Sequence, residues 1–178
     1  MSDSEQDFRA IYDAHFAFVW RCLRRLGVRE PDVVDLTQKV FLTAYFKHGQ
    51  FEGRSRLTTW LFGICQRVAS DYRRSARIRR EIATDAAELE AYTASRDEIS
   101  AVTELGQRRR LVNAMLEKLP EPQRVVFVMF ELDEMSGQEI ADLLDISLGT
   151  VRSRLRLARE AFRREVRRLS ALDRKEAV

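Results

Sequence analysis

The chain has 178 residues, of which 45% are hydrophobic, and its formal net charge at pH 7 is +3. This length suffices for one large domain or two small ones with buried cores. No apolar run reaches membrane-spanning length and no secretory signal is visible, so we expect a cytoplasmic protein with no direct membrane insertion. Cys22 and Cys65 have no second Cys or His nearby at a ligand spacing, which argues against a metal site. We expect both to be small residues of the core.

The charges are strongly segregated along the sequence. Residues 72–80 carry five Arg and no acid, and 81–107 carry seven acids and one Arg. Residues 117–145 carry eight acids and two bases, whereas 146–169 carry eight Arg and two Glu. This distribution indicates two separate anion-facing surfaces with acidic stretches between them.

The first part of the chain is predicted to form three helices. Apolar residues over 8–26 follow a helical period that ends at Gly27, and a second helix begins after Pro31 and runs to residue 45. The segment HGQFEGRS then forms a loop, and a third helix has apolar residues on one side over 57–72. Most aromatic residues precede residue 73, so this part should have its own aromatic-rich core.

The second part is also predicted to be helical. Residues 76–95 contain few large apolar side chains, which indicates a linker or a frayed helix. Helical periodicity returns over 99–119, and the prolines of LPEPQ end this helix and begin the next, which continues to Leu132. Because neither β alternation nor a repeat is present, we predict an all-α fold of two small helical domains.

The segment SGQEIADLLDISLGTVRSRLRLARE predicts a helix-turn-helix. Ser136 and Glu139 have the spacing of a capping box, Asp145 is compatible with a left-handed turn, and Ser147 can cap the second helix. Two short helices joined by a tight turn are typical of this DNA-binding arrangement.

The second helix of this motif combines an apolar stripe with a basic one. The apolar stripe should dock the helix on its domain, and it consists of Val151, Leu155, Ala158 and Phe162. The first turn should face bases in the major groove, while later Arg residues meet phosphate or solvent. The candidate DNA-binding residues are Ser147, Thr150, Arg152, Ser153, Arg156 and Arg159. The competing interpretation is a solvated amphipathic helix whose Arg residues only maintain solubility.

Two further segments of the first part carry possible binding surfaces. Asp35, Gln38, Lys39 and Leu42 form one helical stripe, which is either a protein-docking face or simply a solvated face. Residues 51–80 interleave aromatic side chains with Arg, a composition that suits single-stranded DNA through base stacking and backbone contacts. Some of these aromatic residues could equally belong to the core, and for Trp60 the core is the favoured place.

These motifs together resemble those of the extracytoplasmic-function (ECF) sigma factors, two-domain bacterial transcription initiation factors. DLTQKVFLTAY matches the Asp-x-x-Gln-x-x-Phe segment of the family, and RLTTWLFGICQRVASDYRR matches its Thr-Trp-Leu helix. LEKLPEPQRVVFVMFELDEMSGQEIADLLDISLGTVRSRLRLARE matches the C-terminal helix-turn-helix. The resemblance covers nearly the whole chain, from Phe8 to about Val166.

The resemblance implies how the chain is divided and what each part binds. Residues 1–80 would be region 2, 81–107 a flexible acidic linker, 108–172 region 4, and 173–178 a tail. Region 2 would bind the clamp helices of RNA polymerase and capture unstacked bases of the minus-ten promoter element. Region 4 would contact the polymerase flap and read the minus-thirty-five element as duplex. Polymerase-binding residues are then Asp35, Gln38, Lys39, Phe41 and Leu42. Minus-ten-binding residues are Phe51, Arg54, Arg56, Thr58, Trp60, Arg67, Asp71, Arg73 and Arg74.

The leading hypothesis is therefore a promoter-specificity factor that binds core RNA polymerase and promoter DNA and performs no catalysis. No cofactor or small-molecule substrate is expected, because neither a phosphate-binding Gly-rich loop nor a catalytic constellation is visible. The family resemblance also implies an anti-sigma factor as partner. One alternative is a helix-turn-helix repressor or activator that binds duplex operator DNA as a dimer without polymerase. Another is a DNA-rearranging enzyme with a Ser or Tyr nucleophile; Tyr72 has Arg73 and Arg74 beside it, but no other part of that chemistry is evident.

Overall fold

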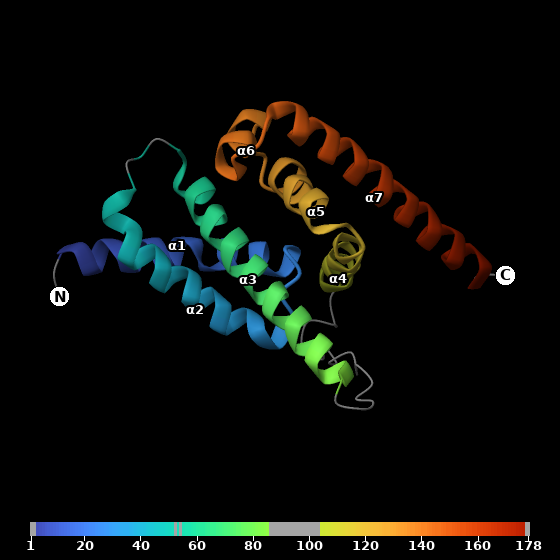
Figure 1. Cartoon of the computed structure of the whole chain (residues 1–178), viewed down its shortest axis with the longest axis horizontal. Helices are drawn as coiled ribbons and strands as arrows, with labels where there is room; N and C mark the ends of the chain where they lie inside the picture. The colour runs from blue at the N-terminus through green and yellow to red at the C-terminus, as the bar shows by residue number, and fades with distance from the viewer. Residues whose placement is uncertain (1–2, 52, 54, 86–103, 177–178) are drawn as a thin grey trace.

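The computed structural model describes residues 3–51, 53, 55–85 and 104–176, and every regular element in these ranges is helical (Figure 1). The α-helices are α1 (Asp3–Arg25), α2 (Glu30–Lys47), α3 (Leu57–Asp85), α4 (Glu104–Glu117), α5 (Glu121–Phe127), α6 (Gly137–Leu144) and α7 (Leu148–Glu176). A short 3₁₀ helix, η1 (His48–Gln50), follows α2, and a π-helical turn, η2 (Val128–Leu132), follows α5. The predicted all-α class is confirmed. No helix among the described residues could cross a membrane.

Helices α1, α2 and α3 pack together as the first domain (Figure 1). Their buried residues follow the helical period that the sequence predicts, with Leu23, Phe41 and Phe62 as large examples from the three helices. Cys22 and Cys65 are free thiols in this core, as expected.

The end of α1 is fixed by backbone geometry at Gly27. This glycine has a φ of +89°, which side chains other than glycine rarely tolerate. Its N–H donates to the carbonyl of Arg24 at 3.1 Å, and the N–H of Val28 donates to that of Leu23 at 3.0 Å. These two bonds close the helix and turn the chain sharply into α2.

Helices occupy both ends of the segment 81–107 that was predicted as a linker. Helix α3 continues to Asp85, beyond the boundary expected at residue 80, and α4 begins at Glu104. The stretch 76–85 contains neither Gly nor Pro, so the helix propagates although its apolar periodicity weakens. The remaining linker residues, 86–103, lie outside the described residues.

Helices α4 to α7 form the second domain. Val125, Val126 and Met129 are buried, and α5 packs on α7, whose own buried residues include Val151 and Leu155. The rings of Phe127 and Phe162 stack with centroids 5.0 Å apart. The C-terminal half of α7 extends away from the rest of the molecule (Figure 1).

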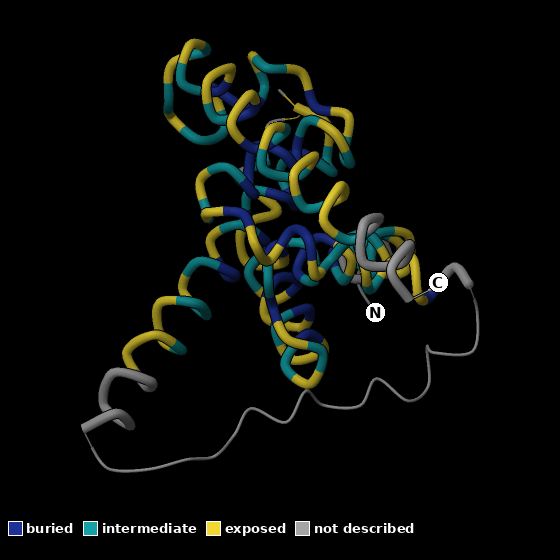
Figure 2. The backbone as a smooth tube through the Cα atoms, turned by 90° about the vertical axis from the view of Figure 1, so that its right-hand side faces the viewer, coloured by how far each residue is buried: buried dark blue, intermediate teal, exposed yellow. Residues whose placement is uncertain are grey.

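The two domains are docked against one another. Their buried apolar residues form one continuous cluster, and Figure 2 shows buried segments meeting in the middle of the molecule. Helix α3 approaches α6 so closely that a Cβ on Gly63 would lie 2.9 Å from Cδ1 of Leu143. Separate domain cores were expected from the sequence, whereas the structure joins them.

Candidate nucleic-acid and polymerase interfaces

The helix-turn-helix has the geometry that its sequence predicts. The N–H of Glu139 donates to Ser136 Oγ at 3.2 Å, and the N–H of Ser136 donates to Glu139 Oε2 at 2.8 Å, which completes the capping box. Asp145 ends α6 in the left-handed conformation, with φ 51° and ψ 50°. Ser147 Oγ then accepts the N–H of Thr150 at 3.0 Å and caps α7. These caps fix the angle between α6 and α7 through local contacts alone.

Helix α7 divides its side chains as expected between core and solvent. Val151, Leu155 and Ala158 are buried. Arg152, Ser153 and Arg156 are exposed on the other side of the helix, and Thr150 is half-buried beside them. The N-terminal turns of α7 therefore present hydrogen-bond donors on a helix that is fixed to the domain by its opposite face, the arrangement by which a recognition helix reads base edges.

Two arginines of the predicted DNA-binding set on α7 have acidic partners within the second domain. Arg156 pairs with Glu160 at 2.8 Å, one turn along the helix. Arg159 pairs with Glu131 at 2.6 Å, and its guanidinium lies 5.3 Å from the ring centroid of Phe130. The contact with η2 holds Arg159 beside the second-domain core, whereas Arg152 is simply exposed.

The aromatic part of the predicted minus-ten surface lies between α2 and α3. The ring centroids of Phe51 and Trp60 are 5.3 Å apart, and both residues are half-buried. Trp60 packs against the core, as favoured from the sequence. Thr58 and Arg56 face the second domain and help to line a cavity of about 20 Å³. Arg54 lies outside the described residues.

The polar residues of the predicted minus-ten surface on α3 have different surroundings. Arg67 is exposed. Asp71 is also exposed and pairs with Arg74 at 2.5 Å. Arg73 is half-buried, donates to the carbonyl of Leu26 and pairs with Glu121 of the second domain. The sequence predicted these side chains as one DNA-facing set, but the structure places Arg73 inside the domain interface.

Arg124 is the central cation of that interface. It is 8% exposed, and it donates to the carbonyls of Glu117 and Leu119 at 3.0 Å and to that of Leu26 at 3.4 Å. Helices α1 and α4 end close to these carbonyls, so a guanidinium here stabilises two helix C-termini, one in each domain. Burial lowers the pKa of Arg124, and the charge of Arg73 lowers it further. Sequence analysis missed this residue, whose only signal is a single Arg next to the apolar run VVFVM.

A second contact between the domains involves Asp133, which follows η2. Its side chain is 7% exposed and accepts from Arg25 at 3.0 Å, and Cys22 Sγ lies 3.9 Å from Asp133 Oδ2. Burial raises the pKa of Asp133 to about 6, against an ordinary value of 3.8, although the charges of Arg25 and Arg21 act in the opposite direction. Burial, followed by interaction with Cys65 in the same core, raises the pKa of Cys22.

The predicted polymerase-binding stripe lies on the outer face of α2. Asp35, Gln38, Lys39 and Leu42 are all exposed, and Leu42 reaches 59%. Phe41 is instead buried, with its ring 4.6 Å from that of Tyr12, so it supports the stripe from below.

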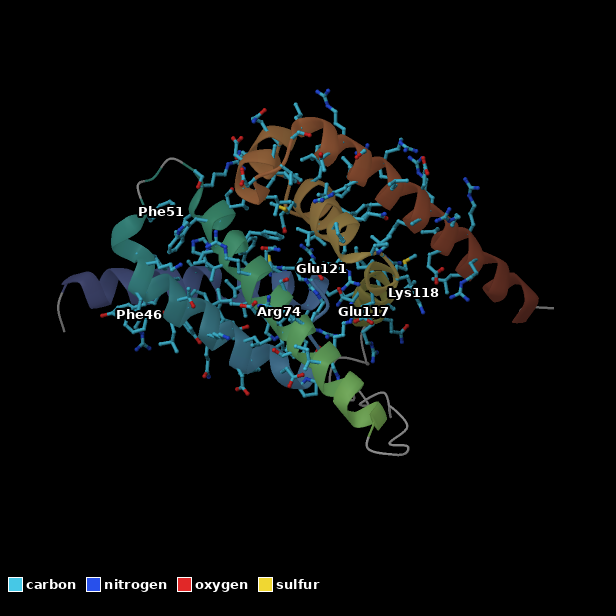
Figure 3. All side chains as sticks on the ribbon, viewed as in Figure 1. Phe46, Phe51, Arg74, Glu117, Lys118 and Glu121 are labelled. Carbon is cyan, nitrogen blue, oxygen red and sulfur yellow. The ribbon has the colours of Figure 1, made fainter. Side chains whose placement is uncertain are left out.

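An apolar groove of about 390 Å³ lies beside this stripe. It is lined by Phe8, Tyr12, Gln38, Phe41, Leu42 and Tyr45. The neighbouring Phe46 is 79% exposed at the end of α2 (Figure 3). Sequence analysis did not include Tyr45 and Phe46 in the polymerase-binding set, although the run AYF at the end of the predicted helix was a possible signal. Exposed aromatic side chains of this size are typical of protein contacts.

The fold and surfaces define a two-domain helical DNA-binding protein with a helix-turn-helix in its second domain. Family models agree with this class: Sigma-70 region 2 matches residues 11–79, and Sigma-70, region 4 matches residues 109–162. The ECF RNA polymerase sigma-E factor of Escherichia coli K12 is 37% identical over 149 residues, which cover 80% of this chain and 78% of that protein. The sigma-E factor of Haemophilus influenzae is 32% identical over the same length and coverage. The chain belongs to the ECF group of the sigma-70 family.

Two solved structures have the same fold. CnrH in complex with the cytosolic domain of CnrY gives a TM-score of 0.65 at 24% identity and covers 91% of this chain and 88% of its own. The sigma factor RpoE of Bartonella quintana, in complex with the anti-sigma factor NepR, gives 0.68 at 21% identity and covers 91% and 98%. Members of the family are non-enzymatic initiation factors, and the chain accordingly binds core RNA polymerase and promoter DNA and directs promoter-specific transcription initiation.

Proposed function

We propose that the two domains read different parts of one promoter, with region 4 on duplex minus-thirty-five DNA and region 2 on the melted minus-ten element. The observation that carries this proposal is the division of α7, where Val151 and Leu155 are buried while Arg152 and Arg156 are exposed. An Arg in the major groove can bind a guanine edge through two hydrogen bonds. Ser147, Thr150, Ser153 and Arg159 complete the proposed duplex-binding surface.

The proposed minus-ten surface runs from the loop after α2 along α3. Its aromatic members, Phe51 and Trp60, can stack on unpaired bases, while Arg54, Arg56, Arg67 and Arg74 supply positive charge. Thr58, Asp71 and Arg73 complete the assigned set. Because unpaired bases bind this surface better than paired ones, binding of the protein increases the fraction of promoter DNA that is melted. This process needs no ATP.

The α2 stripe is the proposed polymerase-binding surface, through Asp35, Gln38, Lys39 and Leu42, with Phe41 supporting it from the core. The flap of the polymerase is the proposed contact of region 4. The assigned boundaries are 1–80 for region 2, 81–107 for the linker, 108–172 for region 4 and 173–178 for the tail. We place the protein in the cytoplasm, with an anti-sigma factor as inhibitor.

Run-off transcription with purified core polymerase on a promoter library tests this function directly. Polymerase alone should give no specific products, and addition of the chain should select promoters that share two sequence elements. A helix-turn-helix repressor would instead bind duplex operator without polymerase and give no products. Products that do not depend on the chain would refute the proposal.

Two variants separate the proposed roles. Arg152→Ala should cost about 1 to 3 kcal/mol of discrimination at one minus-thirty-five position, with polymerase binding intact. Arg167→Ala is the matched control, because it removes the same charge about 22 Å further along α7. An equal loss for Arg152→Ala on every promoter sequence would exclude base reading.

The double variant Asp35→Ala with Gln38→Ala should weaken capture of core polymerase without altering DNA binding. Asp13→Ala removes an exposed acid from the neighbouring helix α1 and serves as control. Undiminished capture by the double variant would remove the α2 stripe from the polymerase interface.

A further inference from the structure

A cavity of about 440 Å³ lies where the turn after α1 and the middle of α3 meet the second domain. This volume is within the range of small-molecule sites in proteins. The end of α4 comes next to α3 here, as the position of Glu117 shows (Figure 3). We call it the arginine cavity, because the charged residues that line it are Arg29, Arg73, Arg77, Arg124 and Glu117.

The arginine cavity has a strong excess of positive charge. The described residues contribute four arginines and one glutamate to its lining, which gives a formal charge of +3. Arg29 and Arg77 are exposed, whereas Arg73 is half-buried and Arg124 is buried. A small anion inside the cavity would therefore meet guanidinium groups on its solvent side and on its buried side.

The two inner guanidinium groups lie against the same short piece of backbone. Arg73 of α3 donates to the carbonyl of Leu26, and Arg124 of α5 donates to the same carbonyl at 3.4 Å. A Cβ on Gly27 would collide with Nη1 of Arg124 and would lie 3.9 Å from Cδ of Arg73. Two like charges are thus held side by side. Burial, and then the charge of Arg73, lowers the pKa of Arg124.

The protein compensates these two charges only in part. Glu121 pairs with Arg73. Arg124 has main-chain carbonyls as its hydrogen-bond partners among the described residues, and such carbonyls carry only partial negative charge. The Nε atoms of both arginines are buried without a hydrogen-bond partner in the same part of the chain. Because a buried charge is costly without an opposite charge nearby, this arrangement favours an anion in the cavity.

The lining suits a ligand that carries more than one phosphate group. A guanidinium group binds two phosphate oxygens at once through its planar fork of donors. A single phosphate carries at most about two negative charges at neutral pH, fewer than the positive charges of the cavity. The ring of Tyr72 adds an uncharged wall, since its hydroxyl group already donates to Asp32 at 2.6 Å. Such a wall can accept a base by stacking.

We propose that the arginine cavity binds a small oligophosphate, either free diphosphate or the diphosphate or triphosphate group of a nucleotide. Arg73 and Arg124 hold the phosphates from the buried side, Arg29 and Arg77 hold them from the rim, and Tyr72 forms the wall beside them. Because the lining comes from both domains, a bound ligand stabilises the folded chain. Apart from Arg73, these residues belong to none of the surfaces proposed for promoter DNA or polymerase.

Isothermal titration calorimetry of the full chain measures this binding at constant ionic strength. The ligands are inorganic phosphate, pyrophosphate, ATP and GTP, each without Mg²⁺. We expect one site per chain and pyrophosphate binding about tenfold tighter than phosphate binding, because pyrophosphate engages more guanidinium groups. Tighter binding of a nucleotide than of pyrophosphate identifies a nucleotide site, and equal or weaker binding identifies a site for free diphosphate. Absence of saturable binding, or equal binding of phosphate and pyrophosphate, overturns the proposal.

Removal of the rim charges tests where the ligand binds. Arg29→Gln with Arg77→Gln should weaken pyrophosphate binding about tenfold or more, because two charged hydrogen-bond donors are lost. Arg9→Gln with Arg163→Gln is the matched control, since it removes two exposed arginines that do not line the cavity. Equal weakening by the two double variants would show a non-specific attraction of charge and would exclude the site.

Removal of the acid from the lining gives a test that damage to the fold cannot imitate. Glu117→Gln should tighten pyrophosphate binding about threefold, because the positive charge of the cavity rises. The carbonyl of Glu117, which accepts from Arg124, is retained in this variant. Asp142→Asn changes an exposed acid of α6 outside the cavity and should leave the affinity unchanged. Unchanged or weaker binding by Glu117→Gln contradicts the proposed position of the ligand.

The rim variant also distinguishes a small ligand from nucleic acid. Binding of a fluorescein-labelled single-stranded oligonucleotide is measured by anisotropy for the unmodified chain and for Arg29→Gln with Arg77→Gln. We expect this variant to lose much more affinity for pyrophosphate than for the oligonucleotide, because the inner arginines are buried. Equal losses would make the cavity part of the DNA-binding surface, and the proposal of a small ligand would be wrong.

Discussion

Replacing Asp133 by Asn should reduce the pH dependence of folding stability between pH 7 and pH 5. The carboxyl group lies in the domain interface with Arg25, Arg21 and Cys22 around it, and burial raises its pKa to about 6 from an ordinary 3.8. The folded protein therefore binds this proton more tightly than the unfolded chain. The stabilising contribution of Asp133 is complete below pH 3.8 and is lost as the pH rises through 6.

The expected size of this effect follows from the difference in pKa. One pKa unit corresponds to about 1.4 kcal/mol, so a difference of about two units is worth ~3 kcal/mol in full. Only part of it develops in the accessible range, and lowering the pH from 7 to 5 should add about 1 kcal/mol to the free energy of unfolding through Asp133. Acids with lowered pKa values, such as Glu121, act in the opposite direction. The difference between wild type and variant isolates the Asp133 contribution.

Urea denaturation followed by circular dichroism at several pH values between 5 and 8 measures this difference. Asp133→Asn keeps an oxygen that can accept from Arg25, and Asp142→Asn provides an exposed control on α6. The free energy of unfolding of wild type minus that of Asp133→Asn should rise by about 1 kcal/mol from pH 7 to pH 5. A difference that stays constant or falls on acidification would refute the buried, proton-binding role of this carboxyl group.

Substitutions at three further positions test the contacts that define the fold. Arg124→Ala should lower the free energy of unfolding by about 3 kcal/mol in urea denaturation, because three carbonyls lose a buried cationic donor. Arg124→Met should lower the free energy of unfolding by less. Equal effects of the two variants would contradict the capping role. Gly27→Ala should cost about 2 kcal/mol, because its φ is positive and its Cβ would lie 2.3 Å from Arg124 Nη1; unchanged stability would exclude this turn geometry. Ser136→Ala should cost about 1 kcal/mol while Ser136→Thr retains stability, and similar losses for both would argue against the hydroxyl cap.

The helix-turn-helix was largely determined by the sequence. Its capping box, left-handed Asp145 and Ser147 cap each depend on residues within four positions of one another, so side-chain chemistry is sufficient to predict them. The same holds for the exposed and buried sides of α7 and α2, which follow the helical period. Phe41 was assigned to the polymerase-binding set by resemblance, and the structure packs its ring against that of Tyr12.

The docking of the two domains was decided by the tertiary structure. Arg73 meets Glu121 at a separation of 48 residues, Arg124 meets the carbonyl of Leu26 at 98, and Arg25 meets Asp133 at 108. Local propensities and periodicity contain no information about such pairs, and a segregated charge pattern shows only that opposite surfaces exist. The burial of each surface depends on which other surface covers it. Packing between helices far apart in the chain therefore explains the raised pKa of Asp133, the burial of Arg124 and the covering of Arg73.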